Sequence, residues 1–202
     1  GRLSVVLVDD QSEDGTAERA FEAAASRGGL ERQTASLADE RYDARFSDGR
    51  RFLIRRAPPL PSGWTGKLWA VNAGLQAMQE ESPEARYALL IDADITIAPT
   101  TLALLVSHAE KNSLALVSLM ARLDSRGVWG GLLIPAFVFY FQKLYPFRRV
   151  NDRADATAAA AGGCMLVRRD ALDDIGGVAP NRGDIIDDCA LAGASKQIDR
   201  PI

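Results

Sequence analysis

The sequence predicts an α/β fold in which a mostly parallel central sheet is flanked by helices. Short, continuous apolar runs at residues 3–8 and 87–91 are typical of strands buried on both faces of a parallel sheet. Loops and helical periodicity follow each run, and such alternation favours helices on both faces of one sheet. A chain of 202 residues is long enough for one good core, so we expect a single domain.

Local patterns predict the elements of the first half. Residues 16–29 are rich in helix formers and end in two glycines, which indicates a helix with a glycine stop. Residues 30–56 are polar, so we expect mostly loop there, with one strand-like run at residues 51–56. Apolar residues then recur at helical spacing from residue 68 to residue 78, which predicts a helix beginning near Gly66.

The second half continues the alternation. Pro99 suits the first turn of a helix over residues 100–111, and an apolar run predicts a strand within residues 114–120. Residues 162–169 predict another strand, residues 170–177 a short helix, and residues 187–196 a last helix.

Composition excludes several functions. A net charge of −3 leaves no basic footprint for nucleic acid. Cys164 and Cys189 are far apart among small or apolar residues, which indicates two buried thiols in a reducing, cytoplasmic compartment rather than a disulfide. With His108 as the single histidine, zinc has too few ligands, so any metal here is held by oxygen.

Two acidic pairs follow the apolar runs. Asp9 and Asp10 end the first, where structural capping of the next loop is the plainer explanation. Asp92 and Asp94 end the second, and on an extended chain such residues point the same way, toward the crevice where α/β sheets bind ligands. Two carboxylates with water and phosphate oxygens suit magnesium or manganese, although one D-x-D triplet is a weak motif alone.

Two further features complete the pattern. Lys67 follows Gly66 at a predicted helix start, where backbone N–H groups and a cation can face a phosphate, although a solvated lysine is commoner. Asp187 and Asp188 open the last predicted helix, where the helix dipole alone favours carboxylates. Together these groups predict a metal–nucleotide site with a general base.

Five stretches in this order resemble family 2 glycosyltransferases, which are inverting enzymes with the GT-A, nucleotide-diphospho-sugar transferase fold: VVLVDDQSEDGT, GWTGKLWAVNAGL, LLIDADITIAP, AGGCMLVRRDALDDIGGV and IIDDCALA. GWTGKLWAV and the aromatic segment at residues 128–147 look most like the hopanoid-biosynthesis-associated members. The resemblance implies one catalytic domain fragment, with a nucleotide-binding half at residues 1–120 and an acceptor-binding half at residues 121–202. It also implies truncation at both ends, because the chain starts at the family's second strand.

The resemblance assigns roles to the nucleotide-binding residues. Asp9 and Asp10 match the acidic pair that contacts the base, with Asp10 preferred, and Lys67 matches the lysine beside the nucleotide. The donor is then a nucleotide-diphosphate sugar, and the enzyme is a hexosyltransferase-type glycosyltransferase.

The resemblance also assigns the metal ligands and the base. Asp92 and Asp94 match the D-x-D motif that binds manganese or magnesium, with Asp94 the more direct ligand and Asp92 nearer the sugar nucleotide. Asp188 matches the general base. The family's late pair is usually Glu-Asp, whereas here Asp187 precedes Asp188.

Residues 128–141 carry no charge and five aromatic side chains. Fourteen residues are too few for a membrane-spanning helix, which needs roughly 20. The many aromatic side chains, followed by basic residues, suit a peripheral segment at a membrane interface. Packing of the segment in the protein core is an alternative of equal weight. The interface reading predicts a lipid acceptor, such as a hopanoid or a polyprenyl carrier, at the inner face of the cytoplasmic membrane.

Three rival functions share some of these features. A response-regulator receiver domain also has acidic strand ends, but Asp92 lies too far along the chain from Asp10, and the GWTGK helix start has no place there. A non-catalytic nucleotide-binding remnant would retain metal-dependent binding without transfer. A nucleotidyltransferase would release pyrophosphate rather than a nucleoside diphosphate.

Overall fold

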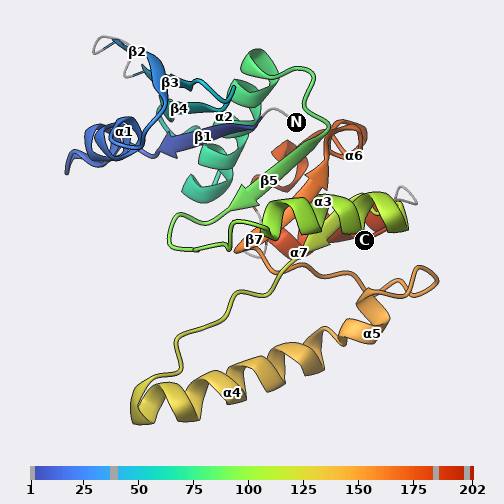
Figure 1. Cartoon of the computed structure of the whole chain (residues 1–202). Helices are drawn as coiled ribbons and strands as arrows, with labels where there is room; N and C mark the ends of the chain where they lie inside the picture. Colours follow the sequence, from blue (N-terminus) through green and yellow to red (C-terminus); the bar gives the residue numbers. More distant parts are fainter. Residues whose placement is uncertain (1–2, 37–40, 184–186, 198–200) are drawn as a thin grey trace. The chain divides into compact units, whose positions relative to one another are not determined.

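The computed structural model describes residues 3–36, 41–183, 187–197 and 201–202 (Figure 1). Asp187, Asp188 and Gln197 are described by their backbone alone. The chain divides into two compact units, Gly1–Ala85 (unit 1) and Arg86–Ile202 (unit 2), each with its own sheet. The expected single domain with halves meeting at residue 120 stays a prediction.

Unit 1 has a four-stranded mixed sheet. Strands β1 (Ser4–Asp9) and β4 (Arg51–Arg56) are parallel, and the sheet order is β1-β4-β3-β2. The remaining pairs are antiparallel and involve β3 (Arg41–Phe46) and β2 (Leu30–Ser36). Two helices complete the unit, α1 (Thr16–Ala25) and α2 (Gly66–Glu81). The strand expected at residues 3–8 and the helix expected near Gly66 are therefore confirmed.

The loop expected over most of residues 30–56 is wrong, because β2 and β3 form there, whereas the strand-like run expected at residues 51–56 is confirmed as β4. Tyr42, Ala44 and Phe46 alternate along β3 and are all buried, so only one face of that strand is apolar. Charged residues occupy the other face, so residues 41–46 carry the period of two that is typical of a half-buried strand. The turn into β4 has Gly49 at a φ of 82°, a left-handed conformation that glycine adopts without strain.

Both helices of unit 1 cover this sheet. Helix α1 packs on β3 and β4, where the rings of Phe21 and Tyr42 lie 5.3 Å apart. Helix α2 packs on β1, so closely that a Cβ added at Gly74 would lie 3.1 Å from Val8 Cγ2. This close approach fixes α2 against the strand that ends in Asp9.

Unit 2 has a three-stranded sheet in the order β5-β7-β6, with β5 (Tyr87–Ile91), β7 (Cys164–Arg168) and β6 (Leu116–Ser118). Its remaining elements are α3 (Thr101–Asn112), α4 (Gly127–Leu144), α5 (Phe147–Val150), α6 (Arg169–Asp174), the short 3-10 helix η1 (Ala179–Asn181) and α7 (Asp187–Gln197). The predicted strands and helices of this half are confirmed within a few residues.

The expectation of a mostly parallel sheet is not confirmed. Both strand pairs of unit 2 are antiparallel, and β1–β4 is the one parallel pair in the part of the chain that the structure describes. A continuous apolar run indicates burial on both faces, not direction. Strand β7 meets this description: Cys164 and Leu166 belong to the core under α3, and Met165 and Val167 are also buried.

Helix α4 covers the apolar segment expected at residues 128–147 and is 18 residues long. By length and composition alone it could cross a membrane, and none of its 18-residue apolar window is buried. The equal alternative of core packing is therefore not what the structure describes.

Candidate functional site

Asp9 ends β1 inside unit 1, although it is charged. Its side chain is 6% exposed, and its Oδ1 atom has no hydrogen-bond partner within the described residues. Pairing of β1 with β4 sets Asp9 beside Arg56, and the N–H of Ala57 donates to the Asp9 carbonyl over 2.8 Å. A buried carboxylate oxygen without a donor is costly, and this cost is commonly retained where a ligand supplies the donor.

A small cavity of about 40 Å³ opens beside Asp9. The Tyr42 hydroxyl donates to Glu18 Oε1 over 2.8 Å. The pKa of Glu18 is lowered, first by a backbone N–H hydrogen bond and then by this hydroxyl. Polar and charged groups therefore dominate the cavity, which is lined by Asp9, Ser12, Ala17, Glu18, Tyr42, Ile54 and Arg56.

Asp10 follows and is exposed, and its carboxylate lies at the start of α2. A Cβ added at Gly66 would come within 3.2 Å of Asp10 Oδ2. The Thr65 hydroxyl caps the helix by accepting from the Leu68 N–H over 3.4 Å. Lys67 is exposed in the same first turn. Unit 1 therefore brings the predicted residues Asp10 and Lys67 to one helix start.

Two tryptophans fix where α2 begins. The indole N–H of Trp69 donates to the carbonyl of Pro58 over 2.7 Å, and its ring meets that of Trp64 edge-on at 5.1 Å. Gly63 precedes them at a φ of 83°, which reverses the chain after the proline-rich loop. The GWTGK run is therefore built to hold a helix N-terminus in place.

Asp92 and Asp94 lie at the end of β5 in unit 2. The N–H of Asp92 donates to the carbonyl of Gly163 over 3.2 Å, and the N–H of Ile95 donates back to the carbonyl of Asp92 over 3.0 Å. The second bond closes a turn, so the extended chain expected through the D-x-D motif is wrong. Asp92 is half-buried and Asp94 is exposed.

These two carboxylates are the candidate metal ligands. No cluster of three or more histidine, cysteine, aspartate or glutamate side chains occurs among the residues that the structure describes. Magnesium is commonly held by one or two carboxylates, with waters and substrate phosphates as the other ligands. Asp92 and Asp94 fit that requirement in donor type and number.

The N-terminal part of α7 lies at the same end of this sheet. The Cys189 thiol donates to the carbonyl of Ala160 over 3.9 Å, and Gly163 lies against Ile95, with its Cβ position 3.5 Å from Ile95 Cδ1. Contacts in residues 160–163 therefore join the D-x-D turn to the beginning of α7. Asp188 is in the first turn of α7, and its side chain lies outside the described part of the chain.

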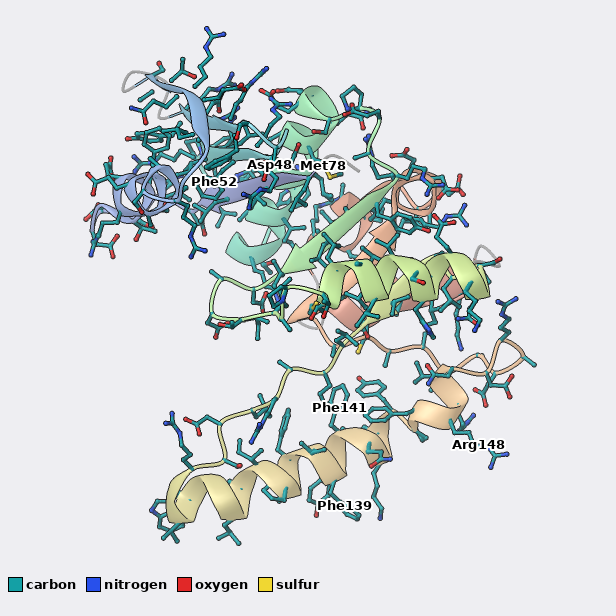
Figure 2. All side chains as sticks on the ribbon, viewed as in Figure 1. Asp48, Phe52, Met78, Phe139, Phe141 and Arg148 are labelled. Atoms are coloured by element: carbon teal, nitrogen blue, oxygen red, sulfur yellow. The ribbon has the colours of Figure 1, made fainter. Side chains whose placement is uncertain are left out.

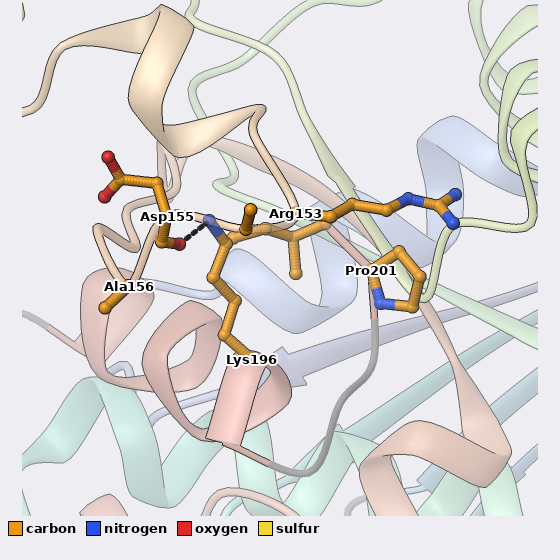
Figure 3. A pocket seen from close by; sticks show the side chains of 7 residues that line it. Arg153, Asp155, Ala156, Lys196 and Pro201 are labelled. Atoms are coloured by element: carbon orange, nitrogen blue, oxygen red, sulfur yellow. Dashed lines mark hydrogen bonds between the residues drawn. The ribbon is translucent and has the colours of Figure 1, made fainter.

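A lysine anchors the other end of α7 (Figure 3). Lys196 Nζ donates to three backbone carbonyls, those of Asp152, Asp155 and Thr157, over 3.0, 3.0 and 2.8 Å. A cavity of about 310 Å³ adjoins it but contains none of the predicted site residues. The ammonium donates three bonds to the backbone, so we assign Lys196 the structural role of holding α7.

The two cysteines are free thiols, as expected. Burial raises the pKa of the Cys164 thiol, so it stays protonated and serves as a small apolar core residue.

Sequence reasoning missed the residues that surround Asp9. Arg56, Glu18 and Tyr42 line its cavity, and they come from two strands and a helix. The usable signal was the alternation of apolar and charged residues over residues 41–46, which predicts strand β3 and places Tyr42 on its buried face.

Comparison with known proteins gives one match. The family model for glycosyl transferase family 2 matches residues 1–176, a span that includes Asp9, Asp10, Lys67, Asp92 and Asp94. No curated protein and no solved structure matches the chain. A match over this much of the chain decides against the receiver domain and the nucleotidyltransferase. The chain therefore belongs to glycosyl transferase family 2, whose members have the GT-A fold, and the protein is a glycosyltransferase that uses a nucleotide-sugar donor.

Proposed function

We propose that this enzyme transfers a sugar, with inversion, from a nucleotide-diphosphate sugar to a hydroxyl or phosphate oxygen of a lipid acceptor. The observation that carries the donor part is the buried Asp9 carboxylate, whose Oδ1 lacks a donor among the described residues. An N–H group on the edge of a nucleobase supplies such a donor. Lipid acceptors of two kinds suit the apolar segment, a hopanoid and a polyprenyl carrier.

The residues of unit 1 bind the nucleotide. Asp9 accepts a hydrogen bond from the base. Asp10, at the end of the same strand, accepts a hydrogen bond from the base or the ribose. Lys67 pairs with the diphosphate, where the N-terminal end of α2 adds the partial positive charge of its dipole. The tryptophan contacts that fix this helix start support the assignment, because they hold these donors in place before the ligand arrives.

Asp92 and Asp94 hold the cation. Members of this family often use a divalent metal, and carboxylate ligands suit magnesium and manganese alike. When bound, the cation neutralises charge that develops on the departing diphosphate. The half-buried Asp92 is braced by its bond to Gly163, and the exposed Asp94 is open to solvent, which leaves room for water and phosphate oxygens.

Asp188 is the proposed general base. It takes the proton from the acceptor hydroxyl while the oxygen attacks the anomeric carbon on the face opposite the leaving group. The new carbon–oxygen bond forms as the bond to the diphosphate breaks, and the nucleoside diphosphate leaves with that electron pair. Inversion follows. A phosphate acceptor is already ionised, so with a polyprenyl phosphate this base would matter little.

The lipid acceptor is proposed from helix α4, which exposes apolar side chains along its whole length. A water-soluble acceptor gives no reason for such a surface. We place the enzyme at the inner face of the cytoplasmic membrane, where nucleotide sugars and the lipid acceptor are both available.

Calorimetric binding of a panel of nucleoside diphosphates, with and without manganese, tests the donor site directly. We expect one base to bind, with an affinity that manganese raises. Removing one group that stabilises developing negative charge typically costs about a hundredfold or more in turnover. Asp94 would act in this way through the cation that it holds, so Asp94→Ala should abolish the manganese effect and transfer.

Asp124→Ala is the matched control, because this exposed aspartate pairs with its neighbour Arg126 and is not one of the proposed site residues. It should leave binding unchanged. Absence of binding by every nucleotide to the wild-type chain would overturn the donor assignment. Release of product with retained anomeric configuration would overturn the inverting mechanism.

A further inference from the structure

Helix α4 is apolar on every side, not on one face. Phe139 and Phe141 project from opposite sides of it (Figure 2). None of its residues is buried. Its large exposed apolar side chains are Val128, Trp129, Leu132, Leu133, Phe137, Phe139, Tyr140 and Leu144.

Such a helix does not suit water. A helix that is apolar all round is normally buried in a protein core or in lipid, and large exposed apolar patches mark interaction sites. An amphipathic helix that rests on a surface would keep one polar face, and α4 has none between Gly127 and Phe141. Its surroundings are therefore apolar on more than one side.

The topology of unit 2 decides how such a helix can enter a bilayer. The chain leaves the sheet at β6, forms α4 and returns at β7, and these strands are hydrogen-bonded neighbours in which Leu116 pairs with Val167. Both ends of α4 are thus tied to one sheet on one side of a membrane. At 1.5 Å per residue its 18 residues extend about 27 Å, near the thickness of the hydrocarbon layer.

A crossing by α4 would require the chain to cross back before β7. Residues 145–163 contain no second helix of spanning length, and they carry charged side chains that lipid would not accept: Arg148, Arg149, Asp152, Arg153 and Asp155. Helix α4 therefore cannot span unless the sheet itself is pulled apart.

Charge indicates which lipids surround it. Residues 119–150 contain five basic and one acidic residue, a net charge of +4, whereas the whole chain carries −3. Arg122 and Arg126 precede the helix, and Lys143 and Arg148 lie at its other end. Lys143 Nζ lies 5.4 Å from the centroid of the Phe139 ring, so its stem runs along the apolar surface. Positive charge at both ends favours an anionic leaflet.

We infer that α4 inserts into a single leaflet of an anionic bilayer, with both of its ends on the side from which it entered. The inference rests on the membrane location in the proposed function and deepens it. The occupant of this surface is therefore phospholipid carrying negative headgroups. A second copy of the chain and a partner protein are the competing occupants.

Flotation of the purified full chain with vesicles measures the interaction. We expect binding to vesicles of phosphatidylcholine with one third phosphatidylglycerol, and weaker binding to phosphatidylcholine alone. The double substitution L132E/F139E places charge at side chains that are 62% and 57% exposed, and it should lower binding about tenfold or more. L104E is the matched control, because Leu104 of α3 is 66% exposed, and it should bind like the wild type.

Removing charge tests the preference for anionic lipid. Each cation near an anionic surface contributes roughly a fivefold gain in binding, so R122Q/K143Q, which removes two of the five cations, should lower the ratio of binding between the two vesicle types by up to about 25-fold. K111Q, at an exposed lysine in the last turn of α3, is the matched control.

Labelling with a membrane-impermeant maleimide tests the topology. S125C and Q142C place a thiol at either end of the helix, and the reagent is added outside sealed vesicles. Both thiols should react. Protection of one end alone would show that α4 crosses the bilayer and would overturn the inference.

Absence of vesicle binding, or concentration-dependent dimers that L132E/F139E abolishes, would overturn it in favour of a protein occupant. None of these readouts requires a nucleotide. Vesicle binding without nucleoside diphosphate binding would instead count against the donor site alone.

Discussion

The two acidic strand ends look alike in sequence and differ in structure. Asp9 and Asp10 follow β1 of unit 1, where Asp9 is buried beside a small cavity and Asp10 lies against the first turn of α2. Asp92 and Asp94 follow β5 of unit 2, where a backbone turn leaves Asp94 exposed.

The difference teaches what each end can bind. A buried carboxylate with an unpaired oxygen is prepared for a directional donor, because a fixed N–H group relieves the cost of its burial. An exposed turn suits a hydrated cation, whose remaining ligands are water and phosphate oxygens. In the proposed function, the buried end therefore recognises the base and the exposed end binds the cation beside the diphosphate.

Asparagine substitutions at the two acidic strand ends test this difference in role most directly. With Asp94→Asn, manganese should no longer raise nucleotide affinity, so the ratio of Kd without and with metal should fall to about one. With Asp9→Asn, affinity should fall about tenfold with or without metal, since a charge-assisted hydrogen bond contributes roughly 1.5–3 kcal/mol. Calorimetric titration of both variants measures the ratio.

Thermal unfolding provides the second readout for this pair. Asp9→Asn removes a buried charge whose Oδ1 has no hydrogen-bond partner among the described residues, so its Tm should not fall below that of the wild type. Asp94→Asn should also leave the Tm unchanged, because Asp94 is exposed. If Asp9→Asn instead abolished the manganese effect, the division of roles between the two ends would be wrong.

Local signals account for the parts of the fold that the sequence predicted. The apolar run of β1, the helical spacing and Thr65 cap of α2 and the run of β5 are each visible within a short window. The run of β4 was visible as well. Strands β2 and β3 were not predicted, because polar and charged residues dominate both, although the apolar and charged residues of β3 alternate with the period of a half-buried strand. Strand direction also depends on which strands pair, and that information is non-local.

The same limit applies to the site. Sequence alone located both acidic ends and Lys67 at a helix start, and it preferred Asp10 to Asp9 as the residue that reads the base. The burial of Asp9 depends on the pairing of β4 with β1 and on the cavity that Tyr42 helps to line. The residues responsible lie far from Asp9 in the sequence, so no local pattern shows them. The roles themselves stay predictions, and the asparagine pair tests them.

A charged network joins α2 to β4 in unit 1, the unit that contains the buried Asp9. Arg51 and Arg55 of β4 both pair with Glu81 at the end of α2, and the hydrogen bond from Arg51 is the main reason that the pKa of Glu81 is lowered. A carboxyl whose folded-state pKa is lowered stabilises the fold above its unfolded value of about 4.5. That stabilisation is lost as pH falls through the folded-state pKa.

Glu81→Gln should therefore lower the free energy of unfolding by about 1 kcal/mol at pH 7, a figure already reduced for its 29% exposure. The difference from the wild type should narrow at pH 3. Thermal unfolding at both pH values measures it, and the exposed neighbour Glu80→Gln is the control. A difference that persisted at pH 3 would show that the loss comes from packing rather than charge.

The smallest effect on nucleotide affinity is expected from a single methyl group added beside Asp10. Gly66→Ala places Cβ 3.2 Å from Asp10 Oδ2, so the carboxylate must shift by a few tenths of an ångström. Because the side chain can rotate away, stability should change little, while nucleotide affinity should fall by about threefold through the lost alignment of Asp10. Gly193→Ala in α7 is the control, since nothing lies within 4 Å of its added Cβ. Unchanged affinity in Gly66→Ala would mean that Asp10 does not touch the donor, and recognition of the base would then rest on Asp9 alone.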